Sequence, residues 1–146
     1  MILLNRQYFF KMHIKRMGLN MAKVSMCTLI IRDDFKNVLI LQKKVKKGEE
    51  DSFALLTQKL RGKESEEKCI NRAVKDSLKS IIFDLEKIQN YELSDQEEIA
   101  VYVGDLKERI VLDKAYKDYK WINKRQLDDF NLSEVEKDIL SLYFEK

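Results

Sequence analysis

The segment LRGKESEEKCINRAVKDSLKSI, residues 60–81, decides the fold that the sequence predicts. Ser65 precedes two glutamates, and an oxygen side chain followed by acids is typical of the first turn of a helix, because it satisfies free N–H groups and suits the helix dipole. Apolar or small residues then recur at helical spacing, at positions 69, 70, 73, 74, 77, 78 and 81. The pattern predicts a helix over residues 66–79.

Strand patterns precede this helix. Apolar and β-branched residues fill residues 24–32, and a second apolar run covers residues 37–42. The intervening DDFK has turn character, so the two runs are predicted to form a hairpin. A charged loop then leads to a short apolar segment at residues 53–56.

Further strands and two short helices follow the long helix. Residues 81–93 and 98–106 are predicted to form paired strands, and residues 119–122 a short third strand. Asn123 and Ser133 are suited to cap helices that extend to residue 130 and to about residue 144. One long helix packed on such a sheet predicts an α+β or mixed α/β fold.

The composition fits one compact domain of ordinary polarity. The chain has 146 residues, 45% of them apolar and 36% charged, and contains no proline. No apolar run approaches 18 residues, so we expect no membrane-spanning helix. Residues 1–20 carry four basic residues and no acid, which leaves a net charge of −1 for the rest of the chain and argues against a nucleic-acid surface.

Residues 1–20 are expected to be a non-essential N-terminal extension, and residues 21–146 to form the domain. Met21 opens MAKVSMCTLII, which has the character of a domain start. An amphipathic helix at a membrane surface is the alternative for the extension.

Cysteine and histidine usage excludes several kinds of site. Cys27 lies in an apolar strand pattern and Cys69 on the charged helix, which indicates reduced thiols in a cytoplasmic protein, not a disulfide framework or a zinc site. His13 is the only histidine and lies in the extension, so a histidine-dependent catalytic triad is not expected in the domain.

With the helix placed, the sequence resembles the Nudix superfamily. The family's motif, the Nudix box, runs glycine, five residues, glutamate, seven residues, Arg-Glu, apolar, any residue, Glu-Glu, any residue, glycine, apolar. Glu64 matches the first glutamate, Arg72 the arginine and Val74 the apolar position. Three flanking segments agree with this register: NVLILQKK at 37–44, FALLTQ at 53–58 and YKWINKRQLDDF at 119–130. The resemblance implies an α/β/α sandwich with a mixed sheet, and in some members a homodimer.

The box is degenerate at the positions that carry its chemistry. Gln58 and Lys79 replace the two glycines, and Ala73, Asp76 and Ser77 stand where the family has glutamates. The family hydrolyses a phosphoanhydride in nucleoside diphosphate compounds with divalent ions, which offset phosphate charge and activate water. Two formal negative charges are missing here, and only Asp76 can bind metal as an anion.

The first functional hypothesis is therefore a Nudix-fold protein whose pyrophosphohydrolase activity is lost or strongly reduced. By the resemblance, it binds a nucleotide-type ligand or a protein partner. Lys43, Lys44 and Gln58 are the candidate ligand-binding residues, since the lysines could meet phosphates without metal. Glu64 and Arg72 are assigned a structural role, which is to hold the shape of the box through charge-assisted hydrogen bonds.

The alternative is a hydrolase that uses Mg²⁺ or Mn²⁺ at a non-standard site and acts on a nucleoside diphosphate-linked compound. Asp76 would bind the metal, and Glu97 or Glu98, at a loop–strand junction, would supply further carboxylates. A module that only binds proteins is the third possibility. Trp121 and Tyr119 could stack on a base, but Trp121 is more typical of a core residue.

Overall fold

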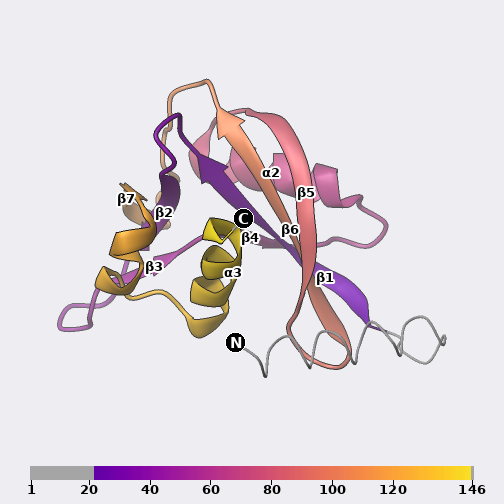
Figure 1. Cartoon of the computed structure of the whole chain (residues 1–146). Coiled ribbons are helices and arrows are strands. Elements are labelled where there is room, and N and C mark those ends of the chain that lie inside the picture. Colours follow the sequence, from indigo (N-terminus) through magenta and orange to yellow (C-terminus); the bar gives the residue numbers. More distant parts are fainter. Residues whose placement is uncertain (1–21, 146) are drawn as a thin grey trace.

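The computed structural model describes residues 22–145, and its centre is a mixed sheet of seven strands. Five strands form the path β3-β2-β1-β6-β5, while β4 pairs with β1 and β7 pairs with β2 (Figure 1). The strands are β1 (Lys23–Arg32), β2 (Val38–Lys43), β3 (Ser52–Ala54), β4 (Leu56–Lys59), β5 (Ile82–Glu92), β6 (Glu97–Leu106) and β7 (Tyr116–Ile122). The pair β1–β6 is parallel and the other pairs are antiparallel.

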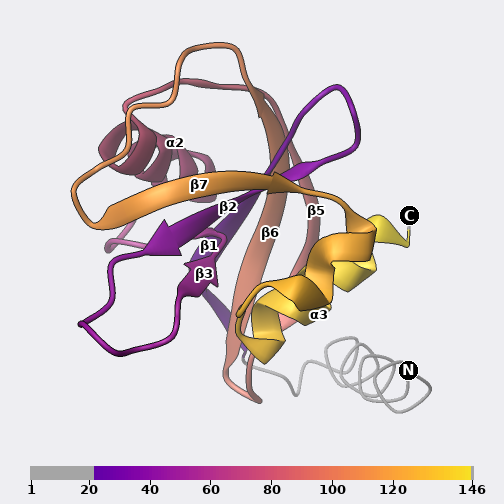
Figure 2. The same cartoon turned by 90° about the vertical axis from the view of Figure 1, so that its left-hand side faces the viewer.

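Helices cover both faces of the sheet, because alternate residues of the central strands are apolar on each side. Helix α2 (Glu66–Leu78) packs on the face that carries Cys27, Leu29 and Ile31 of β1. Helix α3 (Glu134–Phe144) packs on the opposite face, where Ile30 lies. Figure 2 shows the two helices on opposite sides of the strands. The α/β/α sandwich with a mixed sheet is therefore confirmed.

The helix ends follow the predicted caps. The Ser65 side chain accepts a hydrogen bond from the Lys68 N–H at 3.2 Å, so α2 begins where the sequence indicates. Asn123 caps a 3₁₀ helix, η1 (Lys124–Asp129), and Ser133 caps α3, each with a reciprocal capping box.

Several strands differ from their predicted form. Strand β7 begins at Tyr116, three residues earlier than the pattern indicates. The first part of the strand is mostly exposed and partly charged, so it lacks the apolar pattern by which a strand is recognised in a sequence. The segment predicted at residues 53–56 is divided between β3 and β4, which pair with different strands. Strand β5 also bulges, with Asp84 at a φ of 53°.

The division of residues 53–59 opens the sheet between β1 and β2. These two strands share only the register pair Arg32–Val38. Beyond that pair, β4 lies beside β1, whereas β3 and β7 lie beside β2. The strands therefore diverge and leave room for a cavity between them.

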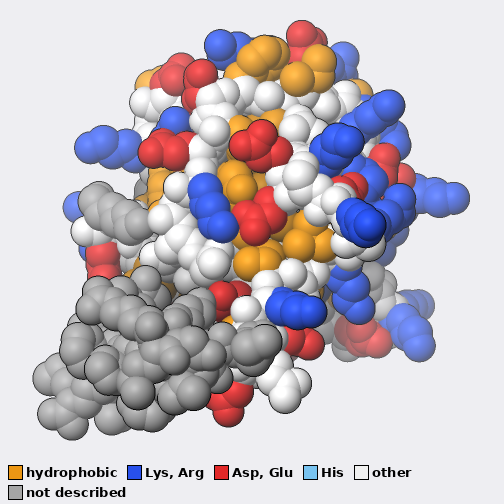
Figure 3. Space-filling model, turned by 90° about the vertical axis from the view of Figure 1, so that its right-hand side faces the viewer, with side chains coloured by type: hydrophobic (Ala, Val, Ile, Leu, Met, Phe, Trp, Pro, Cys, Tyr) orange, Lys and Arg blue, Asp and Glu red, His pale blue; other side chains and the backbone are white. Residues whose placement is uncertain are grey.

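Charges of both signs cover the outer surface on the side of β5 and the start of α2. Figure 3 shows lysine and arginine side chains mixed with aspartate and glutamate there, and apolar atoms visible between them. No helix among residues 22–145 is long and apolar enough to cross a membrane. The extension predicted at residues 1–20 lies outside the described residues.

Candidate functional site

The loop before α2 is fixed to the helix by Glu64 and Arg72. Arg72 Nη2 donates to Glu64 Oε1 at 2.8 Å and Arg72 Nε donates to Glu64 Oε2 at 2.9 Å, a bidentate pair whose side chains are only 15% and 14% exposed. Arg72 also donates to the Lys59 carbonyl at 2.9 Å, which joins the helix to β4. These are the contacts that the structural role of the two residues requires.

The Glu64–Arg72 pair predicts a specific pH dependence. The hydrogen bonds from Arg72 lower the pKa of Glu64 from 4.5 to about 2. A lowered folded-state pKa stabilises the protein fully above about pH 4.5, and this stability is lost as the pH falls towards 2. Urea unfolding of the wild type and Glu64→Gln should therefore show a stability difference that is largest near neutral pH and shrinks below about pH 4.5. A difference independent of pH would contradict the pairing.

The end of α2 also follows the box register. Lys79 has a φ of 50°, the left-handed conformation that favours glycine, and it stands where the family has its second glycine. The Lys79 side chain donates to the Asp76 carbonyl at 2.9 Å and so helps to cap the helix. The backbone therefore keeps the shape that the motif implies although the glycine is absent.

The three carboxylate positions of the box lie in different environments. Ala73 is 4% exposed and belongs to the core cluster beneath α2. Asp76 is exposed, and Ser77 is half-buried against the β6–β7 loop. The Asp113 N–H donates to the Ser77 carbonyl at 2.8 Å, and the Tyr116 N–H donates to the Asp113 carbonyl at 3.0 Å. The β6–β7 loop therefore packs against the backbone of α2 at Ser77.

These residues do not fit a divalent metal cluster. Asp76 is the one carboxylate among the three positions, and among residues 22–145 no three aspartate, glutamate, histidine or cysteine side chains are arranged to hold a metal ion. Mg²⁺ needs hard oxygen ligands and gives up water reluctantly, so one carboxylate supplies a weak site at most.

The structure does not bring Glu97 or Glu98 to Asp76. Both glutamates begin β6, beside Lys23 and Val24 of β1, and Glu98 is buried with 4% exposure. The end of α2 instead contacts the loop that follows the other end of β6. A ten-residue strand separates the two places, which is about 30 Å at 3.3 Å per residue. The combination of Asp76 with Glu97 or Glu98 is therefore not formed.

Glu66, in the first turn of α2, forms hydrogen bonds to two neighbouring strands. Its Oε1 atom accepts hydrogen bonds from Lys87 Nζ and the Tyr102 hydroxyl, each at 2.9 Å. Burial, with the nearby Glu66 carboxylate, raises the pKa of Tyr102 above its usual range. These contacts tie the first turn of α2 to β5 and β6.

A cavity of about 350 Å³ occupies the gap where β1 and β2 diverge. Thr28 and Thr57 line it and share a hydrogen bond of 2.8 Å between their hydroxyls. Lys43 and Tyr116 also line it, and they are register partners in the β2–β7 ladder. The Tyr116 N–H donates to the Asp113 carbonyl at 3.0 Å, and Asp113 in turn contacts Ser77, so this wall of the cavity approaches the box end of α2. The remaining lining residues are mostly apolar and come from β1, the β3–β4 segment, the end of β5, β6 and α3.

The predicted ligand-binding residues are placed unequally. Both lysines are exposed, but Lys43 lines the cavity and Lys44 does not. Gln58 faces α2, where its backbone carbonyl accepts a hydrogen bond from the Cys69 thiol. Thr57, the neighbour of Gln58, points to the cavity because successive strand residues face opposite sides. Trp121 packs against the core below α2, and Tyr119 is 36% exposed; neither lines the cavity.

Sequence reasoning missed Tyr116 and Glu136. Glu136 lines the cavity from α3 and accepts a hydrogen bond from the Leu55 N–H on the β3–β4 segment. The spacing of Ser133 and Glu136 predicts a capping box. The contact between Glu136 and Leu55 joins residues 81 positions apart, so no local pattern predicts it. Tyr116 gave no motif, and burial raises the pKa of its hydroxyl.

Both cysteines are buried free thiols. Cys27 is the register partner of Gln58, and the Cys69 thiol donates to the Gln58 and Lys59 carbonyls at 3.5 Å, so the two meet beneath α2. Burial raises the pKa of Cys27 to about 12 and also raises that of Cys69. Such thiols are core residues and not nucleophiles.

Comparisons with known proteins agree on the fold. No family model matches the sequence, and no curated protein matches it significantly. Among solved structures, MutT from work on Aliivibrio salmonicida and Vibrio cholerae superposes with a TM-score of 0.70 at 11% identity, over 84% of this chain and 97% of that one. A NUDIX hydrolase from Nitrosomonas europaea gives a TM-score of 0.66 at 12% identity, over 83% and 88%.

A third similar structure contains a ligand. The NUDIX domain of Shewanella oneidensis NrtR, complexed with ADP-ribose, gives a TM-score of 0.64 at 13% identity, over 85% of this chain and 88% of that one. Identities this low establish architecture alone. Residues 22–145 therefore have the fold of the Nudix superfamily.

Proposed function

We propose that this chain binds a nucleotide-type ligand in the cavity between β1 and β2 and hydrolyses it very slowly or not at all. The observation that carries the proposal is the contrast between two neighbouring parts of the site. The cavity keeps Lys43 at its wall, whereas the adjacent box positions offer Asp76 as their one carboxylate.

The size and lining of the cavity support a small ligand. A volume of about 350 Å³ lies in the range of small-molecule sites, which are mostly apolar with a few placed polar groups. Thr28, Thr57 and Tyr116 supply hydroxyls that can orient a sugar or base, and Lys43 supplies a positive charge for phosphate. The ADP-ribose held by the NrtR domain makes ADP-ribose the first compound to test.

The charge at the box supports slow or absent turnover. Hydrolysis of a phosphoanhydride develops charge on phosphate oxygens, and metal ions held by several carboxylates normally offset it. Here Ala73 lies in the core and Ser77 has an uncharged side chain, so neither position contributes a negative charge. Binding can proceed through Lys43, but the transition state lacks its usual stabilisation.

Calorimetric titration with ADP-ribose tests the proposal. We expect saturable binding with a dissociation constant on the order of 10 µM without metal. Lys43→Ala should weaken it about fivefold, since a charge-assisted hydrogen bond to phosphate is lost. Lys44→Ala is the matched control and should bind like the wild type, because Lys44 lies outside the cavity. Equal affinity in both variants would remove Lys43 from the site.

Product release measured in the same samples, with Mg²⁺ or Mn²⁺ added, separates this proposal from a hydrolase. The hydrolase alternative has one favourable observation: Asp113 lies beside Ser77, so a second carboxylate residue stands near Asp76. Metal-dependent turnover that disappears in Asp76→Asn would establish that alternative. The absence of both binding and turnover across a panel of nucleoside diphosphate compounds would instead favour a protein-binding module.

A further inference from the structure

An open groove lies at the far end of α2, apart from the cavity. It has a volume of about 790 Å³ and is formed by the end of α2, the start of β5 and the β6–β7 loop. Its lining residues are Asn71, Lys75, Lys79, Ser80, Ile81, Glu108, Arg109 and Val111. None of them also lines the cavity that holds Lys43.

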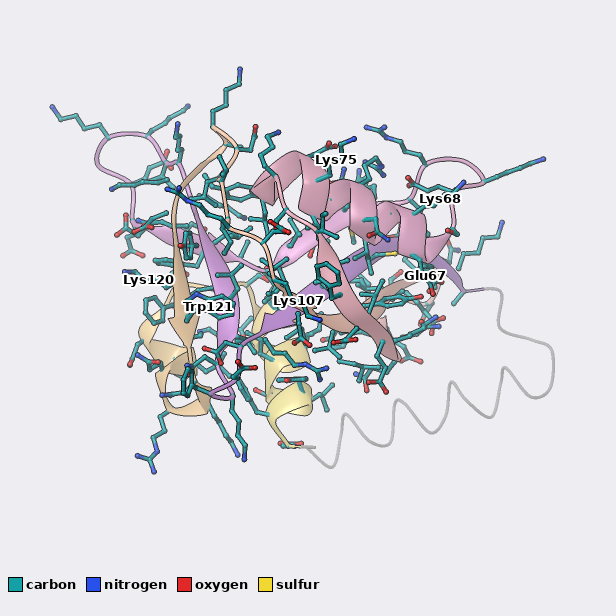
Figure 4. All side chains as sticks on the ribbon, turned by 90° about the horizontal axis from the view of Figure 1, so that it is seen from above. Glu67, Lys68, Lys75, Lys107, Lys120 and Trp121 are labelled. Carbon is teal, nitrogen blue, oxygen red and sulfur yellow. The ribbon has the colours of Figure 1, made fainter. Side chains whose placement is uncertain are left out.

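The groove lies on the side of α2 opposite to Ala73 and Ser77, two of the three carboxylate positions of the box. Asn71, Lys75 and Lys79 are spaced four residues apart and so share one helix face. At about 100° per residue, this face points away from Ala73 and Ser77. Figure 4 shows Lys75 on the outer surface of α2, near the opposite end of the helix from Glu67 and Lys68. Any ligand of the groove is therefore separate from the ligand of the cavity.

The groove combines positive charge with exposed apolar side chains. Lys75, Lys79 and Arg109 contribute three positive charges, and Glu108 is the one acid among the lining residues. Ile81 is 55% exposed and Val111 is 53% exposed, although both are large aliphatic residues. Exposed apolar groups surrounded by charged residues are typical of protein-interaction surfaces.

Stabilisation of α2 explains the cations of the groove but not its exposed apolar side chains. Cations near a helix C-terminus interact favourably with its dipole, and Lys79 caps the Asp76 carbonyl. The Val111 N–H donates to the Leu78 carbonyl at 2.8 Å, which fixes the backbone of the loop but leaves the Val111 side chain in solvent. Neither contact accounts for Ile81 and Val111 being exposed side by side with Arg109.

We propose that this groove binds an acidic segment of a partner protein that carries an aliphatic side chain between carboxylates. The aliphatic side chain would cover Ile81 and Val111, while the carboxylates would pair with Lys75 and Arg109. A polyphosphate would satisfy the cations but would leave the apolar residues in water. The apolar part of the groove therefore favours a peptide over a simple polyanion.

Fluorescence anisotropy with the full 146-residue chain tests the proposal. The probe is a labelled peptide of about ten residues made of Asp-Asp-Leu repeats, compared with an Asn-Asn-Leu peptide. We expect saturable binding of the acidic peptide that weakens between low and high salt, because surface charges are screened. Lys75→Glu with Arg109→Glu should weaken binding at least tenfold, and Ile81→Ser with Val111→Ser about fivefold.

Matched variants control for total charge and for loss of apolar surface. Lys63→Glu with Lys68→Glu makes the same charge change outside the groove, and Val45→Ser removes an exposed aliphatic side chain elsewhere. Both should bind the acidic peptide like the wild type. Circular dichroism and ADP-ribose binding should be unchanged in every variant, since none lies in the cavity.

Several results would overturn the proposal. They are no saturable binding at about 1 mM protein, equal binding of the neutral peptide, or equal loss in the groove and control variants. Tripolyphosphate that binds as tightly as the peptide, without sensitivity to Ile81→Ser and Val111→Ser, would show an anion site. Self-association in sedimentation experiments that the groove variants abolish would assign the surface to a second copy of the chain.

Discussion

Ala73→Glu should destabilise the protein by about 4 kcal/mol, even though it restores the residue that the Nudix motif has at this position. Ala73 is 4% exposed and lies in the core cluster with Leu41 and Leu56. A glutamate there adds volume to a packed core and buries a carboxylate without a positive partner in the cluster. A loss of this size is a large part of the 5–15 kcal/mol that typically stabilises a domain.

Urea unfolding followed by circular dichroism measures this effect. Asp76→Glu is the matched control, because it adds one methylene at an exposed position of the same helix and should change stability by less than about 0.5 kcal/mol. Wild-type stability in Ala73→Glu would mean that the side chain reaches solvent beside α2. A carboxylate at position 73 could then help to hold metal, and the Ala73→Glu, Ser77→Glu double variant should gain Mg²⁺-dependent turnover.

Ala73 is buried and Asp76 is exposed, and this difference shows which features of the box can be predicted from the sequence. The helix, its Ser65 cap and the Glu64–Arg72 pair depend on short-range spacing, so the pattern of residues 60–81 was sufficient to predict them. The sequence also revealed which carboxylates are absent. The apolar stripe of the helix included position 73, but the sequence could not show which strands cover it, because that depends on how α2 packs across β1 and β4.

The cavity was less predictable than the helix. Lys43 was identified from its place at the end of an apolar strand, but the cavity exists because β4 pairs with β1 while β3 and β7 pair with β2. These pairings join residues far apart in the sequence, and no local pattern defines them. Long-range packing also decides the place of Glu97 and Glu98: they begin β6, at the opposite end of that strand from the loop that meets α2.

Glu136→Ala should destabilise the protein by about 3 kcal/mol, which lowers the melting temperature by roughly 10 °C. One carboxylate oxygen accepts the N–H of Leu55, a residue only 2% exposed, and the other accepts the Ser133 hydroxyl at 2.8 Å. Alanine removes both acceptors, so a buried backbone N–H loses its partner and α3 loses half of its capping box. Because Glu136 also lines the cavity, the variant should bind ADP-ribose more weakly as well.

Glu136→Gln separates the hydrogen bonds from the charge. Glutamine has nearly the same shape and keeps one carbonyl acceptor, so it should retain most of the stability that alanine loses. Glu134→Ala is the second control, since Glu134 is exposed in the same first turn of α3 and does not line the cavity. Equal destabilisation by Glu134→Ala and Glu136→Ala would mean that helix-end charge matters and the Leu55 contact does not. A loss confined to Glu136→Ala would show that this carboxylate links α3 to the β3–β4 segment and so keeps the cavity open between the diverging strands.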